Sequence, residues 1–370
     1  MEYVKIKECC EILDSQRIPL TAKIRNKGKY PYYGANGIQD YIDDYLFDDE
    51  LVLLAEDGGN FGSKTKPIAY RVSGKCWVNN HAHVLKPKSG MDVDYLCYAL
   101  MFYNVDGIIN GATRQKLTQA AMREMQIPKI DIIKQKKIVS ILNRIQKIFH
   151  AQKKQMDELD TLIKARFVEM FGDATNNNKD WETASVESVC QEILGGGTPS
   201  KAHPEYYEGG DIPWVSSKDM KADVLYDSQI RINKLGVENS AARMVPVNSV
   251  IMVIRSGILK HSLPVAINAV PLTVNQDLKV FVPGDRIITR FMATQFKMQE
   301  KKILAGVRAV TADNIEFNSL KQRLLIIPPI ELQNEFVSFA EQVDKSKSAI
   351  QKSLEKTQTL FDSLMQEYFG

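Results

Sequence analysis

The side chains best suited to chemistry in this chain are amides, hydroxyls and cations in polar segments between apolar runs. Such groups hydrogen-bond to base edges and phosphates, so they are the residue types that contact double-stranded DNA. In the first half the candidates are Lys29, Tyr33, Asn36, Lys64, Asn79, Asn80, His81, Arg114, Gln115 and Lys116. In the second half they are Thr198, Lys201, Ser216, Ser217, Lys218, Arg255, Lys260, Lys279 and Arg308. Any one of them could be an ordinary solvated side chain, but sets that recur at matching places favour DNA contact.

Other chemistry has less support from the residues. Gly195–Lys201 (GGGTPSK) has glycines that could cradle a phosphate, but it lacks the GxxxxGK[ST] spacing, and Pro199 removes a donor. His81 and His83 would project to one face of a strand and could bind a metal. With no cysteine or further histidine at ligand spacing, a structural or DNA-contacting role is favoured and no metal is expected. We find no dinucleotide-binding, HExxH or methyltransferase-type motif, so no catalytic residue is assigned.

Two long helical patterns must position these segments. Ile138–Gly172 carries apolar residues at alternating steps of three and four, which is the period of a coiled coil. Phe336–Gly370 aligns with it without a gap, and both segments end in Phe-Gly. An internal repeat of about two hundred residues therefore organises the chain, each copy being a globular domain followed by a long helix. The alternative is one domain with two unrelated surface helices.

The boundaries between the domains and the long helices are predicted from the positions of proline and asparagine residues. Ile127–Ile130 (IPKI) and Ile327–Ile330 (IPPI) precede the two helices, and proline disfavours helix immediately before it. The asparagine-rich segment 172–179 separates the two halves. We therefore predict domains at residues 1–128 and 173–326, a spacer helix at 129–172 and a second helix at 327–370.

Within the first domain the pattern predicts strands at Leu51–Ala55 and Cys76–Leu85 and a helix at Val93–Phe102. Three of its polar segments have counterparts in the second domain: Asp57-Gly58 with Arg255–Gly257, Val78–His81 with Val274–Asp277, and Gly111–Arg114 with Gly306–Arg308. The halves share an architecture and differ in detail, as two domains that recognise different sequences would.

Composition restricts the class of protein to which this chain can belong. The 370 residues are 44% apolar and 25% charged, which is typical of globular proteins, and the net charge is only +3. Five cysteines without CxxC spacing predict reduced thiols in a cytoplasmic protein. No apolar run approaches the length that spans a bilayer, and the N-terminus lacks a signal-peptide pattern, so no membrane association is expected.

The chain resembles the specificity (S) subunits of type I restriction-modification enzymes. The resemblance is carried by Gly195–Met220, by Tyr30–Ile38 (YPYYGANGI) and by the two IPxI segments with their long helices ending in Phe-Gly. It implies an α/β fold with two strand-rich target recognition domains, each followed by a long helix. The two helices would pair as an antiparallel coiled coil with pseudo-twofold symmetry.

The resemblance also implies a non-catalytic subunit that binds a bipartite DNA sequence. Two modification (methyltransferase) subunits and restriction (motor and nuclease) subunits would join it. No cofactor is expected on this chain, because S-adenosylmethionine, ATP and Mg would bind the partner subunits.

A helix of about 35 residues is about 50 Å long, so the helical pair could set the distance between two half-sites. Apolar residues on the helices are candidates for partner docking, with coiled-coil core as the alternative: Phe167, Met170, Phe171, Met365 and Phe369. Two rival functions are a DNA methyltransferase or nuclease with its own active site, and a coiled-coil scaffold without a nucleic-acid role.

Overall fold

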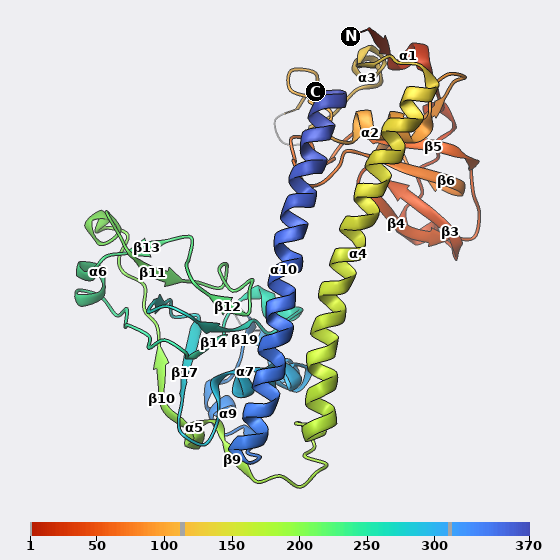
Figure 1. Cartoon of the computed structure of the whole chain (residues 1–370). Coiled ribbons are helices and arrows are strands. Elements are labelled where there is room, and N and C mark those ends of the chain that lie inside the picture. Colours follow the sequence, from red (N-terminus) through yellow and green to blue (C-terminus); the bar gives the residue numbers. More distant parts are fainter. Residues whose placement is uncertain (1, 112–114, 310–312) are drawn as a thin grey trace. The chain divides into compact units, whose positions relative to one another are not determined.

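The computed structural model describes residues 2–111, 115–309 and 313–370 (Figure 1). The chain forms two compact units, of which unit 1 comprises residues 1–154 and 351–370 and unit 2 comprises residues 155–350. Each unit combines strands, short helices and segments of both long helices, so the α/β fold class with two strand-rich domains is confirmed. The unit boundaries fall inside both long helices, whereas the predicted domain boundaries fall near the ends of these helices.

Unit 1 is built on a six-stranded sheet in the order β2-β7-β5-β6-β3-β4. The strands are β2 (Cys10–Ile12), β3 (Lys27–Gly34), β4 (Gly37–Ile42), β5 (Phe47–Ala55), β6 (Ala69–Val78) and β7 (Ala82–Pro87). All neighbours are antiparallel except β3 and β6. Leu51–Ala55 is fully buried, as expected of a continuous apolar run in a central strand.

Shorter elements surround this sheet. They are β1 (Tyr3–Lys5), which pairs with β8 (Gln126–Pro128), the helices α1 (Ile6–Cys9), α2 (Val93–Met101) and α3 (Gln119–Glu124), and the 3-10 turns η1 (Asp14–Gln16) and η2 (Ala22–Ile24). Asp92 caps α2 by accepting hydrogen bonds from the backbone N–H groups of Asp94 and Tyr95. The predicted strand Cys76–Leu85 is wrong as a single element, because a turn at residues 79–81 separates β6 from β7.

Unit 2 repeats this plan with a five-stranded sheet in the order β10-β17-β14-β15-β12. Its strands are β10 (Cys190–Gly195), β12 (Val224–Leu225), β14 (Val250–Val253), β15 (Val265–Asn268) and β17 (Leu278–Pro283). A second sheet has the order β13-β11-β16, formed by β11 (Ile212–Val215), β13 (Arg231–Ile232) and β16 (Thr273–Val274). Two further pairs join β9 (Thr183–Ser185) to β20 (Leu324–Ile326) and β18 (Arg308–Ala309) to β19 (Asp313–Asn314).

The short helices of unit 2 are α5 (Val186–Val189), α6 (Lys234–Glu238), α7 (Thr289–Met298), α8 (Glu300–Leu304) and α9 (Phe317–Lys321), with 3-10 turns η3 (Pro204–Tyr206) and η4 (Gly257–Lys260). The order of the first four strands matches unit 1, with β10, β17, β14 and β15 in the places of β2, β7, β5 and β6. The two halves of the sequence therefore fold into related sheets, as the internal repeat predicted.

The long helices are α4 (Ile132–Phe171) and α10 (Ile330–Phe369), of 40 residues each. In unit 1, Leu142 of α4 clusters with Phe361 of α10, and Gln152 donates a hydrogen bond to Ser353 at 2.7 Å. As residue numbers rise along one helix they fall along the other, so the two segments run antiparallel within this unit.

Unit 2 shows the same pairing with the other two helix segments. Lys347 lies 2.6 Å from Asp160, and Arg166 lies 2.8 Å from Glu335, so the segments again run antiparallel within the unit. The expected coiled-coil period is thus realised by paired helix segments in both units.

A buried glutamine near the start of each long helix attaches that helix to its own unit. Gln135 accepts a hydrogen bond from the N–H of Asp92 and donates to the carbonyl oxygens of Gly90 and Ile130. Gln333 likewise accepts from the N–H of Ile288 and donates to the carbonyl oxygens of Arg286 and Pro328. Each side chain satisfies three groups in one buried place, so the glutamine fixes where the helix leaves its sheet.

An aromatic cluster forms the centre of unit 2. Phe167, Phe171, Phe291 and Phe336 are fully buried, and the ring centroids of Phe167 and Phe336 lie 5.4 Å apart. The prediction that Phe167 and Phe171 are exposed for partner docking is therefore wrong, and the coiled-coil core alternative is correct for them. The sequence pattern could not separate these choices, because core and docking residues share the same helical spacing.

The other residues predicted for docking are half-buried. Met170 packs against the core of unit 2, whereas Met365 and Phe369 pack against the cluster that contains Tyr95 and Phe361 in unit 1. The described cysteines are all free thiols. No described helix combines the length and the apolar character that crossing a bilayer requires.

Replacing Phe336 with alanine is expected to lower the free energy of unfolding by about 3–5 kcal/mol, because it leaves a cavity among three buried rings. Urea denaturation followed by far-UV circular dichroism measures the change. The matched control is Leu162→Ala on α4, whose side chain is 45% exposed and whose loss should change stability by at most about 0.5 kcal/mol. Equal effects of the two variants would contradict the assignment of the aromatic core.

Candidate nucleic-acid interface

Four polar segments of unit 1 meet where strands of its sheet end, and we call them the unit 1 loop cluster. They are the β3–β4 turn, residues 56–58 after β5, residues 79–81 between β6 and β7, and the described part of residues 110–117. The segments are joined by hydrogen bonds: Asn36 Nδ2 to Gly58 O at 2.9 Å, Glu56 N to His81 O at 2.9 Å and Leu117 N to Glu56 O at 2.7 Å. Segments far apart in sequence thus form one polar surface.

The cluster brings together most of the residues predicted for this unit. Asn36, Asn80, Gln115 and Lys116 are exposed there, and His81 is half-buried. Asn36 sits in a tight turn that Gly37 closes with φ of 104°, a left-handed conformation that favours glycine.

The remaining unit 1 predictions have other outcomes. Asn79 is only 3% exposed and accepts a hydrogen bond from the N–H of His81, so the prediction that it contacts DNA is corrected to a role in shaping the turn. Half-buried Tyr33 accepts from the N–H of Asn79 through its backbone carbonyl. Lys29 is exposed at the start of β3, away from the cluster, and Lys64 is exposed in the loop before β6. Arg114 lies outside the described residues.

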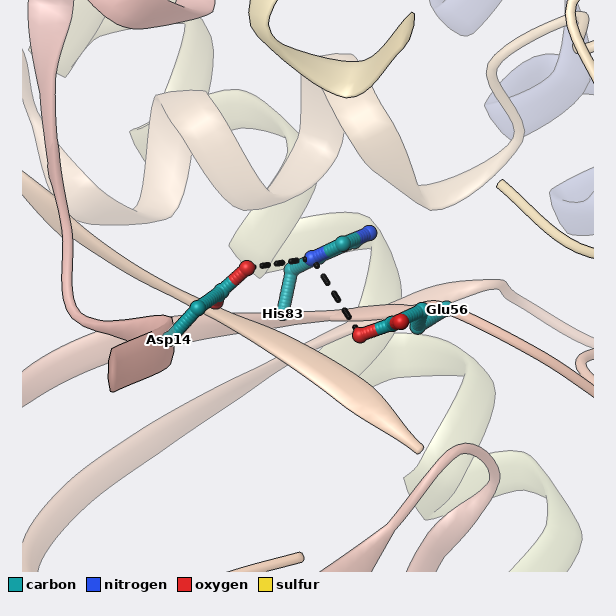
Figure 2. A group of neighbouring side chains, drawn as sticks. All are labelled: Asp14, Glu56 and His83. Atoms are coloured by element: carbon teal, nitrogen blue, oxygen red, sulfur yellow. Dashed lines mark hydrogen bonds and ion pairs between the residues drawn. The ribbon is translucent and has the colours of Figure 1, made fainter. Parts of the chain in front are cut away.

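A buried polar network lies behind the cluster (Figure 2). His83 Nδ1 lies 2.7 Å from Asp14 Oδ2 and 3.7 Å from Glu56 Oε2, and its Nε2 lies 2.9 Å from the carbonyl oxygen of Leu117. Both ring nitrogens thus lie within hydrogen-bond distance of oxygen atoms from other segments of the chain. Because Leu117 follows the predicted DNA contacts Gln115 and Lys116, the network holds their segment against the sheet.

Two cations complete this network. Arg17 lies 2.6 Å from Glu56 Oε2, and Lys116 lies 3.0 Å from Glu56 Oε1. Asp14, Glu56 and His83 offer ligand atoms within 4.8 Å of one another, a spacing that would suit a metal ion. Their ligand atoms instead face Arg17, Lys116 and a backbone carbonyl, so the arrangement is that of an ion-pair network.

The network differs from the histidine pair considered in the sequence. His81 belongs to the turn and lies 2.7 Å from Asp57, whereas His83 belongs to β7 and is buried. The expectation that both histidines lie on one strand face is therefore wrong. Asp14 and Glu56 were missed because they stand far from His83 in the sequence, although Glu56 directly follows a buried strand.

Burial would raise the pKa of the Asp14 carboxyl group, but hydrogen bonds from His83, Gln119 and the N–H of Val84 hold this pKa below its ordinary value. The carboxylate therefore stabilises the folded state above the ordinary aspartate pKa of about 3.9, and this stability is lost as the pH falls through the lower folded-state value.

The equivalent surface of unit 2 has the same backbone hydrogen bonds, and we call it the unit 2 loop cluster. The bond from Asn275 N to Val215 O (2.9 Å) corresponds to that from Asn79 N to Tyr33 O (3.0 Å) in unit 1. The bond from Ile254 N to Asp277 O (2.8 Å) corresponds to that from Glu56 N to His81 O (2.9 Å). The bond from Ile315 N to Ile254 O (2.8 Å) corresponds to that from Leu117 N to Glu56 O (2.7 Å). Val274–Asp277 thus corresponds to Val78–His81, and Arg255 corresponds to Asp57, as the sequence comparison predicted.

One predicted correspondence is shifted. Arg308 of β18 pairs with Asn314 of β19, while Asn110 pairs with Lys116. Since the hydrogen bonds above equate Ile315 with Leu117, Arg308 corresponds to Asn110. The predicted match of Gly306–Arg308 with Gly111–Arg114 is therefore wrong by several residues, because it rested on a shared glycine and arginine rather than on strand pairing.

Some of the predicted cations of unit 2 lie in the loop cluster, and others lie outside it. Arg255 and Lys260 are exposed in the cluster, where Arg255 pairs with Asp277 at 2.6 Å and Lys260 with Asp313 at 3.7 Å. Exposed Lys201 and Lys218 lie on loops beside β11, and the Nζ of half-buried Lys279 lies 4.7 Å from the centre of the Phe317 ring.

The predicted hydroxyl groups also lie near this surface. Thr198 is exposed and donates a hydrogen bond to Gln276, and half-buried Ser216 donates to Asp219 at 2.8 Å. Ser217 is half-buried beside Ser216. Sequence reasoning missed the carboxylates Asp57 and Asp277, although each belongs to a segment whose neighbours were selected.

Asp14→Asn is expected to lower the free energy of unfolding at pH 7 by on the order of 3 kcal/mol, because it removes the buried negative charge that lies 2.7 Å from His83 Nδ1 and 3.6 Å from Arg17. Its stability should also fall less than that of the unchanged protein between about pH 5 and pH 2, as measured by urea denaturation across that range. Asp49→Asn is the control, because the pair of Asp49 with Lys86 at 2.7 Å is exposed. Parallel pH profiles for the Asp14 variant and the unchanged protein would contradict the role of this carboxylate.

Comparison with known proteins agrees with this geometry. A family model described as type I restriction modification DNA specificity domain matches residues 1–160 and 178–358. The chain is 26% identical over 367 residues to a protein of Haemophilus influenzae described as a type I restriction enzyme specificity subunit, which covers 96% of this chain and 90% of that protein. It is 32% identical over 162 residues to the specificity subunit of the Escherichia coli enzymes EcoR124I and EcoR124II, which covers 43% of this chain and 40% of that protein.

The fold is also similar to that of a solved structure. The S subunit of a type I restriction-modification system from M. genitalium matches 100% of this chain and 96% of its own length, with a TM-score of 0.60 and 12% identity. Because the family model spans both halves, the chain belongs to the type I restriction modification DNA specificity domain family, and it is a non-catalytic specificity subunit with DNA target recognition domains.

Proposed function

We propose that each unit recognises one half of a bipartite double-stranded DNA target, and that partner subunits perform the chemistry. The observation that carries this proposal is the pair of loop clusters, which share a backbone hydrogen-bond pattern and differ in their side chains. A common frame with different polar groups is what two related domains need in order to recognise different bases. Because the ligand is DNA, we place the protein in the cytoplasm.

The exposed residues of each cluster support this role. Asn36, Asn80, Gln115 and Lys116 in unit 1, and Arg255 and Lys260 in unit 2, are exposed amides and cations on loops held by rigid strands. Amides and cations bind base edges and phosphates, and a rigid frame fixes their positions before the DNA arrives. Phosphate contacts should make the affinity fall with rising salt concentration.

A selection experiment tests the proposal directly. The chain, combined with its methyltransferase subunits, would be incubated with duplexes randomised over two half-sites and their spacer, and bound DNA would be sequenced. Two enriched half-sites at a fixed spacing would support the proposal. Enrichment of no sequence, or of one uninterrupted site, would contradict it, and a coiled-coil scaffold without a DNA role would enrich nothing.

We further propose that α4 and α10 act as a ruler that sets the spacing of the half-sites. A helix of 40 residues is about 60 Å long, and recognition elements on one DNA face lie about 34–36 Å apart, one turn of the duplex. The antiparallel pairing within each unit supports a stiff connection, because seam residues on both helices are buried.

Removing residues 149–155 from α4 and residues 349–355 from α10 takes one heptad from each helix and keeps the apolar seam in register. The deletion shortens each helix by about 10 Å, so the preferred spacer should change by about three base pairs while the half-site bases stay the same. The selection experiment measures both quantities. Altered half-site bases, or an unchanged spacer, would contradict the ruler. Deleting the heptad from α4 alone is the control, and it should destabilise the helix pair.

The partners that we propose are two modification (methyltransferase) subunits and the restriction subunits, with S-adenosylmethionine, ATP and Mg bound to those partners. A pseudo-twofold relation between the halves would offer two similar docking faces. On α4, Ile141 is 41% exposed and Ile148 is 51% exposed. They are one heptad apart and therefore lie on one face of the helix, while Leu142 and Ile145 face inward. This exposed face replaces Phe167 and Phe171 as the docking candidate.

Ile141→Glu combined with Ile148→Glu is expected to weaken methyltransferase binding at least tenfold, because charges replace apolar contacts that the partner would bury. Mass photometry of the mixed subunits measures the complex, and circular dichroism checks that the helices remain. Ser140→Glu is the control, since it adds charge at an exposed polar position of the same helix. Unchanged assembly of the double variant would rule out this docking face.

A further inference from the structure

The backbone correspondence between the loop clusters equates the side-chain pair Asp57–His81 of unit 1 with the pair Arg255–Asp277 of unit 2. The matching hydrogen bonds place Glu56 with Ile254 and His81 with Asp277, so the next residue, Asp57, corresponds to Arg255. A further bond agrees, because Gly58 N donates to Gln115 O at 3.3 Å and Ser256 N donates to Asp313 O at 3.1 Å. The isolated bridges Asp57–Lys116 and Arg255–Asn314 also correspond.

At these positions each unit has a carboxylate paired with a nitrogen-bearing side chain on the neighbouring loop, and the two units place the carboxylate on opposite loops. In unit 1 the carboxylate is Asp57, and it lies 2.7 Å from His81. In unit 2 the carboxylate is Asp277, and it lies 2.6 Å from Arg255. The carboxylate and its nitrogen-bearing partner have therefore exchanged loops between the two units, while the matched backbone hydrogen bonds are the same.

The pair in unit 2 holds a guanidinium group in a fixed place. Asp277 Oδ1 accepts from Arg255 Nε at 2.6 Å, and Asp277 Oδ2 accepts from Asn275 Nδ2 at 3.1 Å. Asn275 is 7% exposed and its backbone N–H donates to the carbonyl oxygen of Val215, so its side chain holds the Asp277 carboxylate in a fixed position. The Arg255 side chain is 48% exposed, and its Nη1 has no hydrogen-bond partner among the described residues.

The pair of Arg255 with Asp277 is poorly explained by a contribution to the stability of the fold. Exposed ion pairs add little to the free energy of folding, because water screens both charges. A guanidinium held along one edge, with donors left on the other, is instead the arrangement that donates two hydrogen bonds to O6 and N7 of guanine. The carboxylate at the same position of unit 1 can only accept hydrogen bonds, and the base that offers a matching donor is cytosine, through its N4 amino group.

We infer that this pair of side chains from neighbouring loops is a specificity determinant in each half-site. Arg255, positioned by Asp277, selects guanine, and Asp57, paired with His81, selects cytosine. This inference rests on the proposed recognition of a bipartite DNA target. It adds which residue pair distinguishes the two half-sites, and why related backbones recognise different bases.

The selection experiment, run on the full chain with its methyltransferase subunits, tests this with four variants. Arg255→Ala should lower the preference for guanine at one position of one half-site by roughly tenfold to a hundredfold, with the other half-site unchanged. Arg255→Lys keeps the charge but loses the paired donors, so it should also lower that preference. Asp57→Ala should lower the preference for cytosine, and it should do so in the opposite half-site.

The most demanding variant combines Arg255→Asp with Asp277→His, which places the unit 1 pair on the unit 2 backbone. It should change the preferred base at that position from guanine to cytosine. Arg231→Ala is the matched control, because Arg231 is also 48% exposed and forms an ion pair with Asp227 at 2.7 Å in the same unit. The control should leave both half-sites unchanged, and thermal unfolding of every variant checks that the fold is retained.

The outcomes separate the inference from the function on which it rests. If the unchanged protein enriches no bipartite sequence, the proposed function fails and this inference fails with it. If the unchanged protein is specific but Arg255→Ala keeps the same guanine preference, or the combined variant keeps the original base, only the inference is overturned. Loss of preference in both half-sites with Arg255→Ala would also overturn it, since one pair would then not act on one half-site.

Discussion

Packing between the two long helices is the interaction on which both units depend. Each unit contains one segment of α4 and one of α10, and unit 1 is completed by residues 351–370, which follow unit 2 in the chain. Phe369, next to the last residue, packs on Tyr95 of unit 1 with ring centroids 5.1 Å apart. Phe167 and Phe336, from different helices, share the aromatic core of unit 2. The hydrophobic seam therefore contributes to the core of each domain as well as linking the helices.

On this support, each sheet carries its loops in the same way. The hydrogen bonds from Leu117 N to Glu56 O in unit 1 and from Ile315 N to Ile254 O in unit 2 close the two clusters alike. Behind the loops, the units differ: unit 1 has Glu56 in a buried ionic network, where unit 2 has the apolar Ile254. Backbone geometry is thus kept by different means, which leaves side chains at the surface free to vary with the DNA sequence.

The features that local periodicity controls could be predicted from the sequence. The three-and-four spacing gave both long helices, and the repeated polar segments gave the correspondence of Val78–His81 with Val274–Asp277. The turn at residues 79–81 was missed, because the alternating pattern of Cys76–Leu85 outweighed the turn signal of two asparagines. Phe167 was misassigned, since helical spacing says which residues share a face and not what covers that face.

The buried network behind the unit 1 loop cluster could not be predicted from the sequence. Asp14 lies in η1, Glu56 directly follows β5 and His83 lies in β7, and only the folded sheet brings their side chains together. A charged residue beside a buried strand is ordinarily a solvated loop residue, so nothing local marked Glu56 as part of an ion-pair network. Long-range pairing of this kind depends on strand order, which a single sequence does not specify.

The buried glutamines Gln135 and Gln333 have a consequence for how such proteins change over time. Both attach a long helix to its own domain through three hydrogen bonds, and the acceptor and donor groups on the domain side are backbone atoms. Because backbone atoms are present whatever the side chains are, a domain with altered loops still fits the same joint. Substitutions in the loops of one domain therefore leave the attachment of its long helix unchanged.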